Sequence, residues 1–142
     1  MRNFRPLIVG NWKMNGLATD LAHIERIASS IADIRADIIL CPVAILLMNA
    51  ARMSTGSRLL IGAQDCSAIQ EGAFTGDISP KMIADSRGNY VIVGHSERRR
   101  HNICVSTKSK RSWTCLYLLM PDRKNASGRS QVAASSSSGV VD

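Results

Sequence analysis

Residues 90–100 read Tyr-Val-Ile-Val-Gly-His-Ser-Glu-Arg-Arg-Arg, and the predicted architecture follows from this stretch. The β-branched run Val91 to Val93 passes through Gly94 directly into polar residues, which is typical of a buried parallel strand that ends at a functional loop. Residues His95 to Glu97 then place an imidazole, a hydroxyl and a carboxylate next to one another. These groups suit acid–base chemistry, and an ordinary polar loop is the alternative interpretation.

A second stretch, Pro6 to Gly16, repeats this design. Its apolar run Leu7 to Val9 is followed by Gly10, and the polar residues Asn11 and Lys13 come soon after. The carboxyl ends of parallel strands meet at one edge of a sheet, so these two strand ends are predicted to share one functional face.

Short apolar runs bounded by turn residues predict four strands. They cover Leu7–Asn11, Asp37–Cys41, Leu59–Ala63 and the run that begins at Tyr90. Between the strands, helices are predicted over Leu17–Ile31, where apolar residues recur every three or four positions, over Ala44–Met53, and from Pro80 onward with Ser79 as the cap. This alternation predicts parallel strands joined by right-handed crossovers, an α/β fold of about four βα units that makes half of an eight-stranded barrel.

The connections carry further signals. Gln64 and Asp65 stand at the end of the third strand, and the loop from Ser67 to Ser79 is longer than most connections in α/β proteins. Long loops often carry a function. Gly88 is predicted to adopt the left-handed conformation just past the last helix.

Length and composition limit the classes of protein that fit. The chain has 142 residues, whereas a complete (β/α)8 barrel needs ~250. A hydrophobic content of 45% with 4% aromatic residues suits an aliphatic α/β interior. No run of about 18 apolar residues is present and the N-terminus has no secretory pattern, so we expect a cytoplasmic protein that does not associate with membranes.

The cysteines predict neither a disulfide nor a metal site. Cys41, Cys66, Cys104 and Cys115 form no Cys-x-x-Cys pair, and thiols stay reduced in the cytoplasm. His101 and Cys104 have a ligand-like spacing, but two ligands without a second pair are a weak zinc signal.

The net charge is +7, and the more basic part follows residue 100, where six basic and two acidic side chains lie. Nucleic acid could be attracted by Arg98 to Arg100 and by Lys108, Lys110 and Arg111. The aromatic residues near them are limited to Trp113 and Tyr117, so a solvated basic segment is favoured over a surface that binds nucleic acid.

Four motifs carry a specific resemblance. They are Val-Gly-Asn-Trp-Lys-Met-Asn from Val9, Gly-Ala-Gln-Asp from Gly62, Gly-Ala-Phe-Thr-Gly-Asp-Ile-Ser from Gly72 and Val-Gly-His-Ser-Glu-Arg-Arg from Val93. In this order they resemble the signatures of the triosephosphate isomerase family over roughly residues 5–100. The resemblance implies a partial TIM barrel, no cofactor, and the interconversion of dihydroxyacetone phosphate and D-glyceraldehyde 3-phosphate through an enediolate, in glycolysis and gluconeogenesis.

The resemblance also implies roles for residues of this chain. Asn11 and Lys13 match the positions that line the substrate pocket, where the lysine places a cation beside the phosphate and the developing enediolate charge. His95 matches the electrophile, which acts as a neutral imidazole; that property is known for the family and is not a deduction from this sequence. Ser96 and Glu97 match supporting positions, and Thr75 matches the tip of the loop by which family members form homodimers.

The family pattern stops after Arg100. Family members continue with a helix, a strand ending in Val-Gly-Glu, and then the carboxylate base and a mobile lid. Residues 101–142 instead include four consecutive serines, Ser135–Ser138, and are predicted to be an atypical tail that is disordered or arises from a shift in reading frame near residue 100. A half-barrel with its own irregular C-terminal tail is the alternative.

No catalytic base is identified in this chain, so we expect a truncated protein with little or no isomerase activity. Two alternatives stay open. One is a non-catalytic fragment or pseudogene product, and the other is a basic half-barrel that binds polyanions through its tail.

Overall fold

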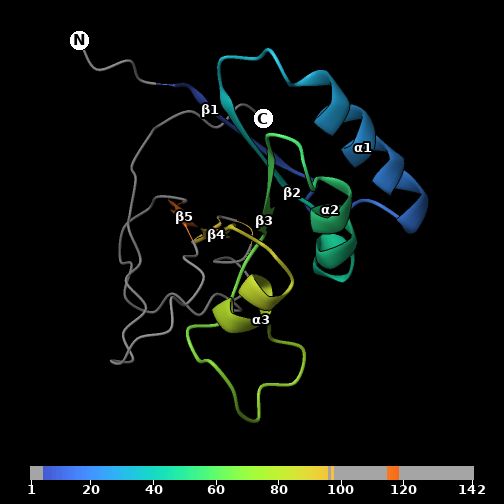
Figure 1. The fold of residues 1–142 in the computed structure, drawn as a ribbon. Helices are drawn as coiled ribbons and strands as arrows, with labels where there is room; N and C mark the ends of the chain where they lie inside the picture. Colours follow the sequence, from blue (N-terminus) through green and yellow to red (C-terminus); the bar gives the residue numbers. More distant parts are fainter. Residues whose placement is uncertain (1–4, 96, 98–114, 119–142) are drawn as a thin grey trace.

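The computed structural model describes residues 5–95, Glu97 and residues 115–118, and its core is one β-sheet (Figure 1). Four strands run parallel and a fifth joins them, in the spatial order β1-β2-β3-β4-β5. Their bounds are β1 Leu7–Asn11, β2 Asp37–Cys41, β3 Leu59–Ala63, β4 Tyr90–Val93 and β5 Cys115–Leu118. The four parallel strands and their connecting helices confirm the predicted half of a TIM barrel.

The register of the parallel strands brings their carboxyl ends to one edge. Asn11 at the end of β1 lies opposite Cys41 at the end of β2. On the other side, Ala63 at the end of β3 lies opposite Val91, two residues before β4 ends. The polar residues that follow β1, β3 and β4 are therefore delivered to one side of the molecule.

The helices cover one face of the sheet (Figure 1). The α-helices are α1 Leu21–Ser30, α2 Leu47–Met53 and α3 Pro80–Asp85, and short 3-10 helices η1 Ala18–Asp20 and η2 Ala44–Leu46 precede the first two. The predicted helices from Leu17 and from Ala44 are thus present, but each begins with a 3-10 turn. At the first of these turns, the Asp20 carboxylate accepts a hydrogen bond of 2.7 Å from the Leu17 N–H, which satisfies a backbone donor at the helix start.

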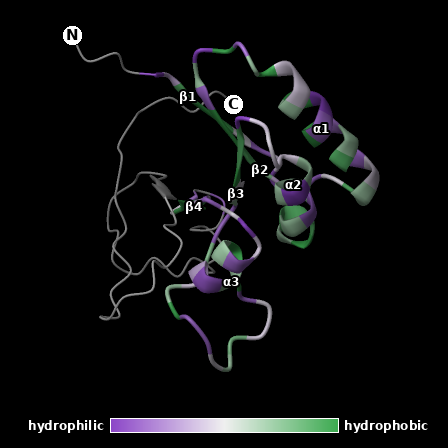
Figure 2. Cartoon of the chain, viewed as in Figure 1, coloured by the Kyte–Doolittle hydropathy of each residue, from purple (hydrophilic) through white to green (hydrophobic). Residues whose placement is uncertain are grey.

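Apolar side chains are buried on both faces of the sheet. Ile24, Ala50, Ile61 and Ile83 are almost fully buried between helices and strands. On the opposite face, Ile39, Cys41 and Ile92 form a smaller cluster. Strands apolar on both faces are typical of parallel sheets, and Figure 2 shows hydrophobic colour along β1, β2 and β3.

The end of α3 differs from the prediction. Arg87, with a φ of 64°, is the left-handed residue, so the assignment of that role to Gly88 is wrong. Arg87 N–H donates to Ala84 O and Gly88 N–H to Ile83 O, both at 2.9 Å, which is the Schellman pattern. Gly88 is needed for packing instead, because a β-carbon there would lie 2.6 Å from Cγ2 of Ile83.

Strand β5 lies within the predicted tail. It pairs antiparallel with β4, Tyr90 opposite Leu118 and Val93 opposite Cys115, whereas a barrel of βα units would add a parallel strand. The other residues from 101 to 142 lie outside the described part of the chain. In the part that is described, no helix is long and apolar enough to cross a membrane.

Candidate active site

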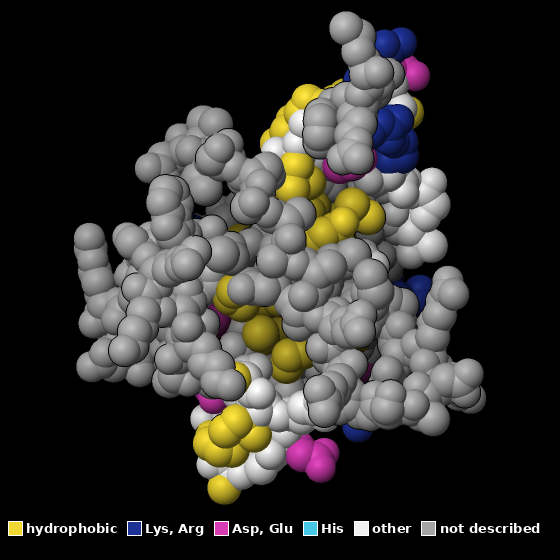
Figure 3. Space-filling model, turned by 90° about the vertical axis from the view of Figure 1, so that its left-hand side faces the viewer, with side chains coloured by type: hydrophobic (Ala, Val, Ile, Leu, Met, Phe, Trp, Pro, Cys, Tyr) yellow, Lys and Arg dark blue, Asp and Glu magenta, His cyan; other side chains and the backbone are white. Residues whose placement is uncertain are grey.

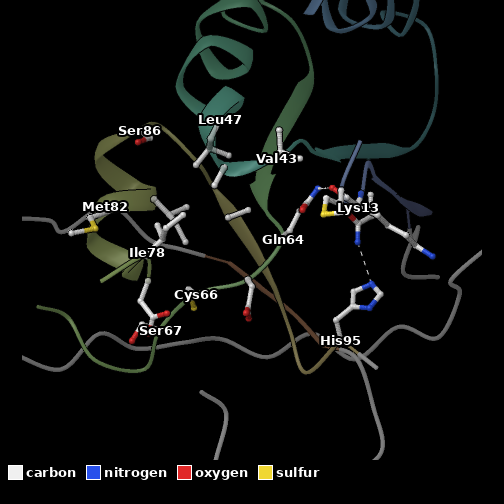
Figure 4. A pocket seen from close by; sticks show the side chains of 18 of the residues that line it. Lys13, Val43, Leu47, Gln64, Cys66, Ser67, Ile78, Met82, Ser86 and His95 are labelled. Atoms are coloured by element: carbon white, nitrogen blue, oxygen red, sulfur yellow. Dashed lines mark hydrogen bonds between the residues drawn. The ribbon is translucent and has the colours of Figure 1, made fainter. Parts of the chain in front are cut away.

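Two of the predicted site residues meet directly at the carboxyl edge of the sheet. Asn11 is the last residue of β1 and His95 follows β4, 84 positions later in the sequence. The Asn11 side-chain nitrogen Nδ2 lies 3.1 Å from Nε2 of His95, and this contact is the dashed line in Figure 4. The structure therefore brings the ends of the first and fourth strands to one site.

Lys13 and Glu97 extend this group. Lys13 Nζ lies 3.2 Å from Glu97 Oε1, and Glu97 Oε2 lies 3.2 Å from His95 Nδ1. Both side chains of the Lys13–Glu97 pair are about half exposed, at 50% and 52%, so solvent screens the pair and its contribution to stability is small. Its importance is geometric, because one carboxylate lies beside both the ammonium and the imidazole.

The hydrogen bonds of Asn11 assign the protonation of His95. The Lys13 N–H donates to Asn11 Oδ1 at 2.8 Å, so the other end of the amide presents its N–H group to His95. Nε2 of His95 accepts that hydrogen bond, which a ring nitrogen does only when it carries no proton. In this arrangement a neutral ring carries its proton on Nδ1, which is buried and lies 3.2 Å from Glu97 Oε2 but makes no hydrogen bond with the described residues.

Lys13 has a left-handed backbone, with a φ of 51°. Its carbonyl oxygen accepts a hydrogen bond of 2.8 Å from Nε2 of Gln64, which follows β3. The sequence places Gln64 at the end of a strand but predicts no role for it. The available signal was its position, because it follows an apolar strand as Asn11 and His95 do.

A cavity of about 590 Å³ opens beside these residues, between the strand ends, helix α3 and the loop that precedes α3 (Figure 4). Its polar lining includes Asn11, Lys13, Gln64, His95 and Glu97, and its apolar lining includes Val43, Leu47, Ile78 and Ile83. This volume lies within the range of small-molecule sites, and nine of the 19 lining residues are polar or charged. Chemically, the site offers an ammonium, an imidazole and amide groups to an oxygen-rich ligand, and the carboxylates of Asp65, Asp77 and Glu97 also line it.

The remaining candidates lie elsewhere. Thr75 is exposed in the loop before α3 and does not line the cavity, although its neighbours Gly76 and Asp77 do. Ser96 lies outside the described residues, as do the zinc candidates His101 and Cys104. Among the residues that the structure does describe, no group of three or more metal-ligating side chains is present. The basic residues Lys108, Lys110 and Arg111 are likewise outside the described part.

Comparison with known proteins adds a family match. The family model described as "Triosephosphate isomerase" matches residues 6–114, which extends past the last recognisable motif. A curated triosephosphate isomerase of Afipia carboxidovorans is 46% identical over 115 residues, covering 77% of this chain and 46% of the relative. One from Rhizobium etli is 54% identical over 98 residues, covering 67% and 38%.

A solved structure agrees with these matches. The crystal structure of triosephosphate isomerase from Bartonella henselae superposes with a TM-score of 0.65 and 41% sequence identity, over 68% of this chain and 40% of that chain. The chain therefore spans less than half the length of the relatives that it matches.

Proposed function

The chain belongs to the triosephosphate isomerase family, and from that premise we propose that its pocket binds a triose phosphate and supports the interconversion of dihydroxyacetone phosphate and D-glyceraldehyde 3-phosphate. The observation that carries the proposal is the convergence of Asn11, Lys13 and His95 on one cavity from two strand ends far apart in the sequence. These are the three positions at which the motifs resemble pocket residues of the family.

The three side chains have complementary roles in this proposal. The Lys13 ammonium places a positive charge where the substrate carries its phosphate and where enediolate charge develops. Substrate oxygens would replace Asn11 as the partner of His95 Nε2. To donate a hydrogen bond there, the neutral imidazole would release its Nδ1 proton to solvent and take up a solvent proton on Nε2. Asn11, released from His95, would have its amide free for the substrate.

We also propose that this chain alone turns over little or no substrate. In the family, a strand ending in Val-Gly-Glu and then the carboxylate base and the lid follow the histidine strand, and residues 101–142 of this chain contain no Val-Gly-Glu sequence. Loss of a general base lowers the rate by about 10²–10⁴-fold, and loss of phosphate-binding loops removes binding energy that orients the substrate.

A coupled assay of the purified full chain tests the activity. The expected result is turnover at least two orders of magnitude below that of a full-length relative measured in parallel. Turnover close to that of the relative would contradict the proposed inactivity while supporting the assignment of the substrate.

A binding experiment tests the pocket itself. Dihydroxyacetone phosphate titrated into the full chain in a calorimeter is expected to bind, and Lys13→Met is expected to weaken the affinity by on the order of tenfold or more because a charged contact to phosphate is lost. Lys81→Met is the matched control, since Lys81 is an exposed lysine of α3 that does not line the cavity. Equal effects of the two substitutions would contradict the proposed role of Lys13.

The family also suggests a homodimer and a cytoplasmic location, and we include both in the proposal. Exposure of Thr75 on a long loop supports a contact with a second subunit. The second candidate function, a non-catalytic fragment or pseudogene product, is favoured by residues 101–142, which carry no segment matching the family's carboxylate base. Translating the encoding DNA in its other two frames beyond codon 100 tests it; a Val-Gly-Glu strand and lid in one of them would support a frameshift, and their absence would count against it.

A further inference from the structure

Lys13 holds a backbone conformation that its residue type disfavours. Its φ of 51° lies in the left-handed region, where a β-carbon crowds the backbone. Such a conformation persists in a folded protein only where surrounding contacts fix it. It also sets the direction of the side chain, so whatever holds this backbone helps to decide where the Lys13 ammonium lies.

Gln64 is placed to hold the backbone of Lys13 in this conformation. The side-chain nitrogen Nε2 of Gln64 donates to the carbonyl oxygen of Lys13 at 2.8 Å and to that of Cys41 at 3.0 Å. A primary amide has two N–H donors, and both are used. One side chain directly after β3 thus links the end of β2 to Lys13, two residues beyond the end of β1. Because Asn11 Oδ1 accepts the Lys13 N–H, Lys13 is held at both of its backbone polar groups.

We propose that Gln64 is a positioning residue that fixes Lys13 in its left-handed conformation and thereby directs the Lys13 ammonium into the pocket. There its Nζ lies 3.2 Å from Glu97 Oε1. An amide is required, because a carboxylate of the same length would set its oxygens against two carbonyl oxygens. The effect on the backbone stands independently of the proposed function, whereas the effect on substrate binding rests on it.

NMR of the full chain tests the effect on the backbone. The coupling between the amide and α protons of Lys13 and the Cα and Cβ chemical shifts of Lys13 report φ. All three are expected to move in Gln64→Ala and in Gln64→Glu, and to stay at the parent values in Gln70→Ala, a control in the exposed loop. Unchanged Lys13 values in Gln64→Ala would overturn the proposal.

A second measurement needs no Gln64 variant and holds even where those variants fail to fold. In the parent chain, the side-chain amide protons of Gln64 are expected to exchange with water on the order of tenfold more slowly than those of Gln70, because two carbonyl oxygens hold them. Equal exchange rates for the two glutamines would overturn the proposal.

Calorimetry with glycerol 3-phosphate, which cannot be isomerised, tests the effect on the pocket. Gln64→Ala and Lys13→Met are each expected to weaken binding by on the order of tenfold, and the double variant no further, because Gln64 acts through Lys13. Losses that add in the double variant would overturn the positioning role. If the parent does not bind this ligand, the proposed function fails, and the two NMR measurements still decide the role of Gln64.

Discussion

Two adjacent residues end helix α3 in different ways. Arg87 takes the left-handed conformation with φ 64°, which glycine adopts more readily, whereas the packing against Ile83 leaves no room for a β-carbon on Gly88. Arg87→Gly is therefore expected to raise the free energy of unfolding by up to about 1 kcal/mol, as relief of strain exceeds the added freedom of the unfolded chain. Gly88→Ala is expected to lower it by about 1–3 kcal/mol through overpacking.

Urea unfolding of the two variants beside the parent chain measures both effects. The two changes in the free energy of unfolding must have opposite signs if backbone conformation decides the effect at residue 87 and packing space decides it at residue 88. Stabilisation by Gly88→Ala, or destabilisation by Arg87→Gly, would contradict this account of the helix end.

Burial of Cys41 makes a prediction about pH. Desolvation raises the pKa of this thiol from 9.0 to about 12, so folding favours its neutral form. The stability that Cys41 contributes is then fully present below pH 9.0 and is lost as pH rises from there towards about 12. Because the thiolate is the reactive form, alkylation of Cys41 at neutral pH should be slow in the folded chain and fast in urea.

Mass spectrometry of peptides after timed alkylation measures this for each cysteine. Cys66, which is only partly buried, is the internal comparison and is expected to react faster than Cys41. Alkylation of Cys41 at the same rate with and without urea would show that its burial is not maintained in solution.

Several residues of the site could be predicted from the sequence because each follows an apolar run and a glycine, as Asn11 and His95 do. The left-handed backbone of Lys13 could not. It depends on a hydrogen bond from Gln64, 51 positions away, and no local pattern encodes such a contact. The left-handed conformation of Arg87 could not be predicted either, because the sequence favours the neighbouring Gly88 for that role.

Among the elements, α3 begins with a side-chain cap followed by a proline. Ser79 Oγ accepts a hydrogen bond of 3.3 Å from Met82 N–H, and Pro80 occupies the first helical position, where no N–H is needed. Ser79 is buried, so water cannot replace the lost acceptor. Ser79→Ala is expected to lower the free energy of unfolding by about 1 kcal/mol.

Ser29→Ala in the exposed last turn of α1 is the control, since Ser29 donates only to Glu25 O among the described residues. Alanine suits that position, so its effect should be neutral or slightly stabilising. Chemical denaturation of both variants compares them, and equal effects would contradict the assignment of Ser79 as the cap.

The bounds of β1, β2 and β3 agree with the predicted strands at both ends, because each strand is a short apolar run closed by polar or turn residues. The helix starts were predicted less well. A 3-10 turn and an α-turn present similar apolar spacing over three residues, so the sequence does not separate η1 from α1 or η2 from α2.

At the scale of the whole molecule, a half-barrel leaves apolar groups exposed. In the described sheet β1 is an edge strand, and Ile8 on it is 52% exposed. Figure 3 shows further hydrophobic side chains on the side turned toward the viewer. Exposed apolar edges favour association between chains, so sedimentation is expected to show self-association that increases with protein concentration.

Ile8→Lys should reduce that association, because a charge on an edge strand opposes pairing. Ile34→Lys, at a position of similar chemistry and 40% exposure away from the edge, should reduce it less. A chain that stays monomeric at every concentration would contradict the account of an open edge.

The half-barrel itself could be predicted because the alternation of strands and helices is regular up to β4. The antiparallel pairing of β5 could not, because it joins two segments without the strand–helix alternation that reveals parallel pairs. Pairing partners of that kind depend on which sheet edge is available in the folded chain.

The central claim is that the ends of β1 and β4 form one site for a phosphorylated three-carbon sugar. The most direct test is an NMR titration of the labelled full chain with dihydroxyacetone phosphate. The account predicts chemical-shift changes at Asn11, Lys13 and His95, with little change at Leu7 and Leu59, where β1 and β3 begin at the opposite edge. Changes confined to that opposite edge, or none at the three site residues at saturating ligand, would contradict it.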